Sequence, residues 1–399
     1  MTNSATPDQS ANLSVSAKSS VFFWMGFWAL FAKFFLQATA VIVVDDALLK
    51  VLLLFGCAFL SFRAVALFVE GCSSGLGIIG ICLGIVSYVL SGESVLLTTS
   101  LLLAAAHEID LQSILKSWSR AVTVIIVLML WAYAIAWLMG MTIGSQWSDI
   151  GGLSSNRNAL FFIHPNYCSA VFFAWAMAAC CRMDVSMALK GIVGAVSAVV
   201  IIAVAGSRTS AVSLLLFYAL VAVFKAWSSC TGSGFAKWAP RIIAAVPPVL
   251  LLFTLWISAV WFMGPSFSQT VSDFLTGRPA LWWAQWNYAG LTILGHHAFE
   301  GVLLIRGTFH DIHTVDGMYA SFLFNIGIAG FIWLLTLAVR ACKLKRNLDP
   351  LFAAALIAIF VFGFTEWHAV NAVVCIPLVY FSRGMTPIKR RVLRDSCYS

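Results

Sequence analysis

Apolar runs long enough to cross a bilayer recur along nearly the whole of this 399-residue chain. In lipid, backbone N–H and C=O groups must pair within their own segment, which makes each run a helix. A bilayer core about 30 Å thick needs roughly 20 apolar residues per helix, so the runs predict an all-α, polytopic membrane protein with about twelve transmembrane helices. Cut at polar clusters, the runs are residues 21–44, 47–62, 75–90, 95–106, 121–143, 167–181, 191–205, 210–224, 242–263, 318–339, 351–364 and 370–381.

Composition excludes an ordinary soluble protein. Hydrophobic residues make up 61% of the chain and charged residues only 10%, whereas soluble domains carry roughly 25% charged residues. The net charge of +8 might suggest nucleic acid as a partner. Most of the basic residues, however, lie in short loops beside the runs and near the C-terminus, as expected of cytoplasmic loops, so orientation explains the charge and no nucleic-acid partner is expected.

Sorting of the basic residues predicts the topology and the domain organisation. With both termini in the cytoplasm, alternating crossings assign most of the 24 Lys and Arg residues to the inside, as the positive-inside rule requires. Residues 1–20 are expected to be a disordered cytoplasmic tail, and residues 384–399 a basic cytoplasmic tail. Residues 21–383 form the transmembrane domain, which includes one large exterior loop, residues 264–317, between the ninth and tenth spans. This loop is rich in aromatic residues, which suggests helices lying on the membrane surface.

A few polar residues do not fit this sorting. The basic residues left outside the cytoplasmic set are Lys33, Lys50, Arg157, Arg208, Arg278 and Arg306. All His residues except His107 also fall on the exterior side. Basic and titratable groups therefore gather where the positive-inside rule disfavours them, which points to a functional exterior face.

Two of the exterior arginines stand among small residues. Arg208 lies within Gly206–Ser210, between two apolar runs, and Arg278 directly precedes Pro279, a residue favoured in the first turn of a helix. A guanidinium can hold a phosphate bidentately, and the free amides at a helix start also attract anions. Both arginines are candidates for one anionic ligand. The alternative for Arg208 is an arginine at a helix end that extends its charge to the lipid headgroups.

Other polar groups flank two of the expected spans. His164 and Asn166 stand on either side of a proline before the sixth span, where Asn166 could cap the helix or contact a hydroxyl-rich substrate. His310, His313 and Asp316 precede the tenth span. A carboxylate or imidazole beside arginines can act as a general base.

Metal and nucleotide chemistry are not indicated. The adjacent pair His296 and His297 would point apart on a helix, and His310 with His313 lacks a clear third ligand. No phosphate-binding loop or dinucleotide fingerprint appears in a suitable context. We therefore expect neither a metal nor a cofactor.

The order of four short motifs resembles the O-antigen polymerase and O-antigen ligase family. They are His-Pro-Asn at 164–166, Gly-Ser-Arg-Thr at 206–209, Thr-Gly-Arg followed by Leu-Trp at 276–282, and Val-Asp-x-x-Tyr at 315–319. Glu366, between the last two spans, is a weaker fifth match. The likeness covers roughly residues 158–381, and its specificity comes from motif order together with topology.

This resemblance implies a multi-spanning glycosyltransferase of the bacterial cytoplasmic membrane, with its site on the exterior face. The implied donor is an undecaprenyl-diphosphate-linked oligosaccharide, whose pyrophosphate Arg208 and Arg278 would hold. His313 and Asp316 are the candidate catalytic bases, and His164, Asn166, His310 and Glu366 are candidate substrate contacts. A chain-length regulator and a flippase of the same pathway are candidate partners, with the membrane lipid itself.

The chain departs from the family pattern at one informative place. Asp316-Gly317 stands where ligases usually carry His-Asn and polymerases often carry Asp-Asn. The aspartate favours a polymerase, which extends a surface polysaccharide, over a ligase, which transfers a finished glycan. A transporter or flippase for lipid-linked glycan is the alternative from another class; it would place charges near mid-membrane and show related halves, neither of which the sequence indicates.

Overall fold

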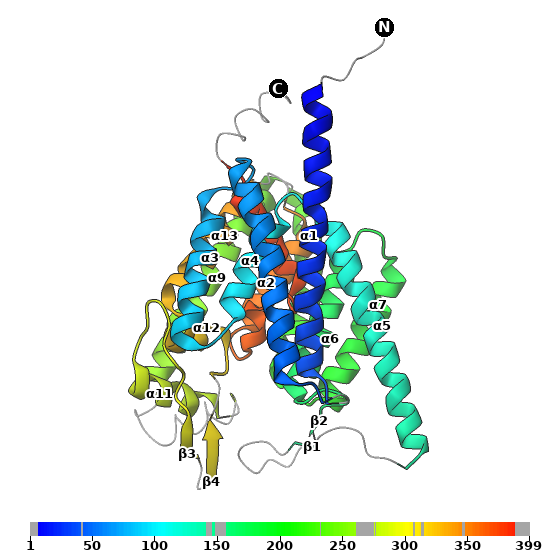
Figure 1. Ribbon diagram of the computed structural model, residues 1–399. Coiled ribbons are helices and arrows are strands. Elements are labelled where there is room, and N and C mark those ends of the chain that lie inside the picture. The colour runs from blue at the N-terminus through cyan, green and yellow to red at the C-terminus, as the bar shows by residue number, and fades with distance from the viewer. Residues whose placement is uncertain are drawn as a thin grey trace.

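The computed structural model describes residues 7–40, 43–140, 146–147, 157–231, 233–260, 275, 277–305, 308–312, 315–344 and 348–387. These residues form a bundle of helices packed side by side (Figure 1). The first half contains α1 (Pro7–Ala38), α2 (Asp46–Val69), α3 (Gly75–Ser91), α4 (Val95–Ala106), α5 (Leu111–Leu138) and α6 (Pro165–Cys181). The second half contains α7 (Met187–Val199), the π-helix η1 (Val200–Val204), α8 (Arg208–Thr231), α9 (Ser233–Val260), α11 (Arg278–Ala289), α12 (Met318–Ser321), the π-helix η2 (Phe322–Ile326), α13 (Ile328–Leu344), α14 (Pro350–Phe362) and the 3-10 helices η3 (Trp367–Val370) and η4 (Ile376–Met385).

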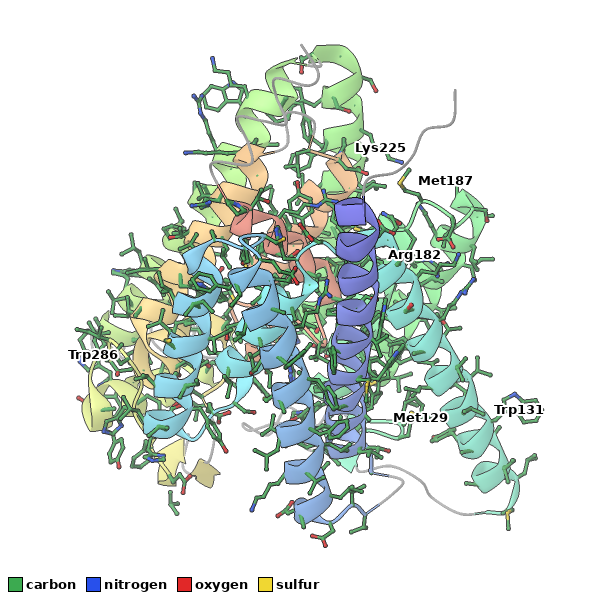
Figure 2. The ribbon with its side chains drawn as sticks, turned by 45° about the horizontal axis from the view of Figure 1, so that its top comes forward. Met129, Trp131, Arg182, Met187, Lys225 and Trp286 are labelled. Atoms are coloured by element: carbon green, nitrogen blue, oxygen red, sulfur yellow. The ribbon has the colours of Figure 1, made fainter. Side chains whose placement is uncertain are left out.

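The lengths and exposed surfaces of the helices indicate that lipid surrounds the bundle. Six of the described helical segments are long and apolar enough to cross a membrane, namely Ser20–Ala38, Asp46–Val69, Leu111–Ala136, Met187–Val204, Arg208–Thr231 and Gly234–Ala259. Large apolar side chains point outward from them: Trp131 of α5 is 66% exposed and Leu128 is 62% exposed, and Trp131 projects away from the bundle in Figure 2. Such surfaces favour lipid over water. The predictions of an all-α fold and of a membrane-embedded protein are confirmed.

The core of the bundle is built around α6. Its residues Phe172 and Phe173 are fully buried, and α6 packs against α5, α7, α8 and α14. A helix that is apolar on all sides belongs at the centre of a bundle, where it contacts other helices rather than lipid.

Two ends of the bundle can be distinguished. The start of α1 and the red C-terminal segment η4 lie at one end in Figure 1. At the other lie α11 and the antiparallel hairpin of β3 (Gly301–Ile305) and β4 (Thr308–Ile312), in which Leu303 pairs with His310. We call this second end the hairpin end. A second short pair, β1 (Gln146–Trp147) with β2 (Arg157–Asn158), also lies there.

The tenth predicted span is not one continuous helix. Residues 318–339 contain α12, the π-helix η2 and a break at Gly327, after which α13 begins. Gly327 has φ +108°, and a Cβ there would lie 2.6 Å from the carbonyl oxygen of Ile293. The helix is therefore interrupted because the backbone at Gly327 approaches the backbone at Ile293 to a distance that only glycine permits.

The twelfth predicted span, residues 370–381, is likewise no α-helix but turns followed by η4. Side chains from neighbouring helices bind its backbone: Thr99 Oγ1 donates to the Val370 carbonyl at 2.8 Å and Trp118 Nε1 to the Val373 carbonyl at 2.7 Å. Because these partners replace the hydrogen bonds of a regular helix, irregular backbone is tolerated inside the protein.

Two further expectations are corrected at the termini of elements. Helix α1 begins at Pro7, so the segment expected to be a disordered tail is helical from that residue onward. No glycine or second proline lies between Pro7 and the apolar run. A helix nucleated in the apolar run can therefore extend back through this segment. The large loop contains the helix α11, as expected, but also the β3–β4 hairpin, which the sequence analysis did not predict.

Candidate active site

Arg278 begins helix α11 at the hairpin end. Gly277 precedes it with φ +83° and ψ −7°, a left-handed conformation that glycine adopts without strain. Pro279 follows in the first turn, where a missing N–H costs nothing. This turn directs Arg278 inward, and its side chain is only 8% exposed.

Two carboxylates from distant parts of the chain surround Arg278. Its Nη2 lies 2.8 Å from Oε1 of Glu366, which follows α14, and its Nε lies 3.7 Å from Oδ2 of Asp316, which precedes α12. We call Arg278, Asp316 and Glu366 the arginine cluster. Three of the motifs singled out in the sequence thus meet at one place. With all three groups ionised, the cluster carries one positive and two negative charges.

The two carboxylates differ in their access to solvent. The side chain of Glu366 is 2% exposed, whereas that of Asp316 is 29% exposed. A buried carboxylate needs a charged partner, so Glu366 is suited to holding Arg278 in place. Asp316 keeps an open side, so it can reach both the arginine and a ligand.

Backbone contacts fix the position of Asp316. Trp282 Nε1 donates to the Asp316 carbonyl at 2.6 Å, and the N–H of Met318 donates to the Gly363 carbonyl at 2.7 Å. Between them Gly317 has φ +96°, and a Cβ there would lie 2.9 Å from the Phe364 carbonyl oxygen. The positive φ and this close approach explain why glycine stands at this position.

The His164 motif lies at the start of α6 and contacts the segment that follows Glu366. His164 caps α6, accepting at Nδ1 from the N–H of Asn166 at 3.0 Å. The prediction that Asn166 caps this helix is therefore wrong, because Asn166 lies in the first turn and the capping side chain is that of His164. The next residue, Tyr167, packs its ring 4.4 Å from that of His368. Burial, with a smaller effect of the nearby His164, lowers the pKa of His368 to about 3. His368 is therefore a neutral imidazole two residues from Glu366.

Arg208 occupies a different position. It begins α8 and is exposed, and it forms no ion pair with any residue that the structure describes. Before it, Gly206 has φ +58° and Ser207 Oγ lies 2.7 Å from Ser210 Oγ. Figure 2 places Lys225, near the other end of α8, away from the hairpin end, so Arg208 lies toward the hairpin end. No hydrogen bond or ion pair among the described residues joins it to the arginine cluster.

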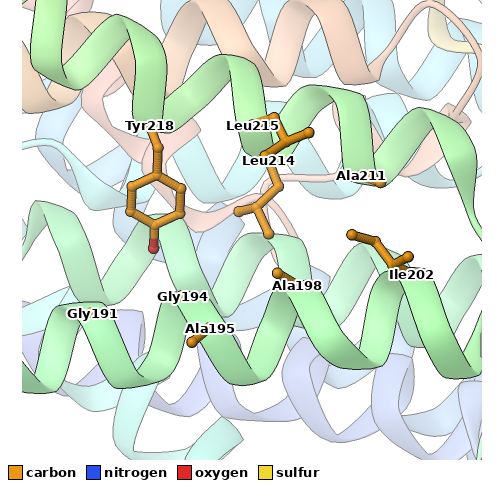
Figure 3. A pocket seen from close by; sticks show the side chains of 9 residues that line it. All are labelled: Gly191, Gly194, Ala195, Ala198, Ile202, Ala211, Leu214, Leu215 and Tyr218. Atoms are coloured by element: carbon orange, nitrogen blue, oxygen red, sulfur yellow. The ribbon is translucent and has the colours of Figure 1, made fainter.

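An apolar groove runs along the helices that meet at Arg208. The groove has a volume of about 280 Å³ and is lined by Gly191, Gly194, Ala195, Ala198 and Ile202 on one side and by Ala211, Leu214, Leu215 and Tyr218 on the other (Figure 3). Small residues on α7 make room for α8: a Cβ on Gly194 would collide with the Tyr218 hydroxyl. Arg208, Ala211 and Leu215 are spaced three and four residues apart, so they share one face of α8.

Two candidate residues cannot be placed. His313 lies outside the described residues, and for His310 the structure describes the backbone of β4 and not the side chain. Because the structure does not describe His313, it does not decide whether His313 or Asp316 is the base. Among the residues that the structure describes, no three His, Cys, Asp or Glu side chains gather as a metal site; the expectation of metal independence remains a prediction.

Sequence reasoning missed the role of His368 and the burial of Glu366. A glutamate flanked by Thr365 and Trp367 between two apolar runs was a usable signal, because an intramembrane carboxylate almost always faces a partner.

Comparison of the chain with protein-family models, with curated proteins and with solved structures finds no match.

Proposed function

We propose that this protein is an integral membrane glycosyltransferase that polymerises lipid-linked oligosaccharide repeat units into a surface polysaccharide such as capsule, O-antigen or exopolysaccharide. The donor is an undecaprenyl-diphosphate-linked oligosaccharide. The observation that carries the proposal is the arginine cluster, in which residues from three separate sequence motifs, Arg278, Asp316 and Glu366, meet in ion pairs. Ionised groups buried at one end of an apolar bundle are typical of a functional site, and a reaction on a polar substrate carried by a lipid would use them.

Donor binding is supported by Arg208 and the groove beside it. An exposed arginine at one end of an apolar groove matches an anionic head joined to an apolar chain. The diphosphate would lie against Arg208 and reach toward Arg278, while the polyprenyl chain follows α7 and α8 in the lipid. A guanidinium provides parallel N–H donors for phosphate oxygens, whose charge grows as the glycosidic bond breaks.

Charge balance divides the work between the two arginines. Arg278 already faces two carboxylates, so its attraction for a further anion is partly cancelled, whereas Arg208 is exposed. We assign the larger share of diphosphate binding to Arg208. Arg278 orients Asp316 and Glu366 and assists the departing phosphate.

The transfer itself needs one base. Asp316, or His313 in the alternative, removes the proton from an acceptor hydroxyl, and the resulting oxygen attacks the anomeric carbon of the donor. The bond between that carbon and the diphosphate oxygen breaks, and undecaprenyl diphosphate leaves with the electron pair. No nucleotide and no metal is required, so a chelator should leave the purified activity unchanged.

The orientation that this reaction requires is part of the proposal. About twelve crossings of the bacterial cytoplasmic membrane, with both termini inside, would place the hairpin end outside, where lipid-linked repeats are polymerised. In a variant whose ten native cysteines are replaced, a single cysteine at Glu300, at the hairpin end, should react with an impermeant thiol reagent only from the outside. A single cysteine at Lys343, near the end of α13, should react only from the inside. The reverse pattern would overturn the mechanism.

A product analysis separates polymerase from ligase. Purified protein in lipid nanodiscs, supplied with a lipid-linked repeat unit, should yield glycans that differ in length by one repeat. A ligase would instead leave the repeat unit unextended and transfer preformed chains to another acceptor. In cells lacking the protein, long lipid-linked chains that cannot be attached would favour the ligase.

A further inference from the structure

A second cavity at the hairpin end is polar, unlike the groove between α7 and α8. It has a volume of about 330 Å³ and lies among α1, α2, the turn between α3 and α4, the start of α6 and the segment around η3. Its charged residues are Lys33, Asp46, Lys50 and Glu93. Lys33 and Lys50 are two of the basic residues that the positive-inside rule left unexplained.

Two hydrogen bonds lie at the wall of this cavity. The Lys33 side chain donates from Nζ to Oε1 of Gln37 at 2.6 Å, and the backbone N–H of Glu93 donates to Ser91 Oγ at 3.0 Å. Burial raises the pKa of the Glu93 carboxyl, and the ammonium of Lys33 opposes that rise. An ionisable residue within a membrane-spanning helix, such as Lys33, marks a functional site by default.

Aromatic rings form other parts of the wall. Tyr88, Tyr167 and Trp367 line the cavity, and Asn371 adds an amide. Rings supply flat apolar faces, whereas carboxylate, ammonium and amide groups supply acceptors and donors. Cavities that bind small ligands combine an apolar wall with a few polar groups in this way, at volumes from roughly 300 to 1,000 Å³.

Net charge decides which class of ligand fits. Two cations and two anions line the cavity, so it has no overall attraction for a diphosphate. A neutral, hydroxyl-rich ligand can use all four groups, because each hydroxyl both donates and accepts. A sugar also presents C–H faces that can lie against the rings of Tyr88 and Trp367.

The cavity adjoins the arginine cluster. Trp367, in its wall, directly follows Glu366, and both Trp367 and Tyr167 pack against the ring of His368. At the rim, a Cβ on Gly92 would lie 3.6 Å from Cε1 of His297 in the large loop. The wall of the cavity therefore includes the residue that directly follows Glu366 in the chain.

We propose that this cavity binds the sugar of the acceptor, with Glu93 and Lys33 as its principal hydrogen-bonding groups. The assignment rests on the proposed function, and it places the acceptor in a cavity that shares no lining residue with the α7–α8 groove.

Binding of free glycan tests the assignment without requiring catalysis. The probe is the oligosaccharide that mild acid releases from lipid-linked glycan of cells that make the protein, titrated against protein in phosphatidylcholine nanodiscs. Wild type should bind, and Glu93→Gln and Lys33→Met should each weaken binding by about tenfold or more, the expected effect of losing one charge-assisted hydrogen bond. Glu70→Gln and Lys343→Met, which remove exposed charges outside the cavity, should bind as wild type does. If either cavity variant elutes as misfolded protein, Gln37→Ala provides the same comparison with a smaller change.

Separate outcomes identify which proposal fails. Cavity variants that bind the oligosaccharide normally, or a phospholipid that co-purifies with wild type and is lost in Lys33→Met, would overturn the acceptor site. Normal glycan ladders from the cavity variants, with Arg208→Ala inactive, would do the same and leave the proposed function standing. Wild-type binding that depends on Glu93, in a protein that never extends a lipid-linked repeat, would uphold the sugar site and reject the polymerase.

Discussion

The guanidinium of Arg278 lies 2.8 Å from the carboxylate of Glu366, although 88 residues separate the two in sequence. Both side chains are buried, and Asp316 shares the arginine at 3.7 Å. Such an arrangement ties helix α11 to the turn that follows α14. It therefore links the large loop to the bundle, and the stability of that link can be measured.

Loss of one partner of this pair should be costly. Glu366→Gln or Arg278→Gln leaves a charge in a buried site, for which roughly 3–5 kcal/mol of destabilisation is expected. Removing both charges should cost less than the sum of the two single changes, because neither charge is then left alone. Unfolding in mixed detergent micelles measures these differences.

A matched control exists in the pair Arg182 and Asp184, which has the same 2.8 Å separation but an aspartate that is 40% exposed. Asp184→Asn should cost less than about 1 kcal/mol, as surface ion pairs do. Equal small effects at both pairs would show that the arginine cluster does not hold the loop.

Gly317 should resist replacement. Its φ of +96° and the 2.9 Å approach of a Cβ to the Phe364 carbonyl predict that Gly317→Ala costs about 1–3 kcal/mol of strain and displaces Asp316. We expect lower membrane abundance and a loss of transfer greater than abundance explains. Gly75→Ala is the control, because nothing lies within 4 Å of its added Cβ. Wild-type activity in Gly317→Ala would contradict the described backbone.

Arg208 and the adjoining groove should act on the donor. Arg208→Ala is expected to slow transfer by about 10²-fold, as loss of an oxyanion donor does, while Arg208→Lys should recover only part of the rate, because an ammonium lacks the planar fork. Ala211→Phe, which narrows the groove, should raise KM for the lipid donor.

The controls for these variants are Arg120→Ala, an exposed arginine outside the proposed sites, and Val212→Phe, whose side chain is 57% exposed on α8. Both should behave as wild type. Unchanged donor kinetics in Arg208→Ala and Ala211→Phe would remove the groove from the mechanism.

His368 predicts a specific pH dependence of stability. Its folded pKa of about 3 lies below the ordinary value of 6.5, so the folded state resists protonation. The stability contributed by the neutral form is complete above pH 6.5 and is lost as pH falls toward 3. At pH 5 wild type should have lost about 2 kcal/mol more than His368→Gln, relative to pH 7.5. His296→Gln, an exposed histidine of the large loop, is the control, and parallel curves for wild type and His368→Gln would contradict the buried neutral imidazole.

Apolar runs predicted most of the helices because the membrane imposes one rule on every span. Their interruptions could not be predicted in the same way. The run around Val370 looks like a span, but Thr99 and Trp118 bind its backbone, and these partners lie 271 and 255 residues away. Gly327 was visible as a glycine, while the backbone that approaches it was not.

The candidate site shows the same division. Arg278 stood out as an exterior arginine before a proline, Asp316 as a carboxylate before the tenth span, and Glu366 as a weaker match. Their meeting depends on how α11, α12 and α14 pack, which a local pattern does not contain. Lys33 was noticed as an unexplained charge, but Glu93, which lines the same polar cavity, is more than fifty residues away and carried no signal of its own.

The central claim is that Asp316 in the arginine cluster transfers the acceptor proton while Arg208 binds the donor. The most direct test compares Asp316→Asn with wild type in nanodiscs, measuring undecaprenyl-diphosphate binding and glycan ladder formation from a lipid-linked repeat unit in the same samples. The account predicts donor binding within about twofold of wild type, since the amide keeps the shape of the carboxylate, and a rate of extension lower by about 10² to 10⁴, the range of general-base catalysis. A ladder that forms at the wild-type rate in Asp316→Asn would contradict it.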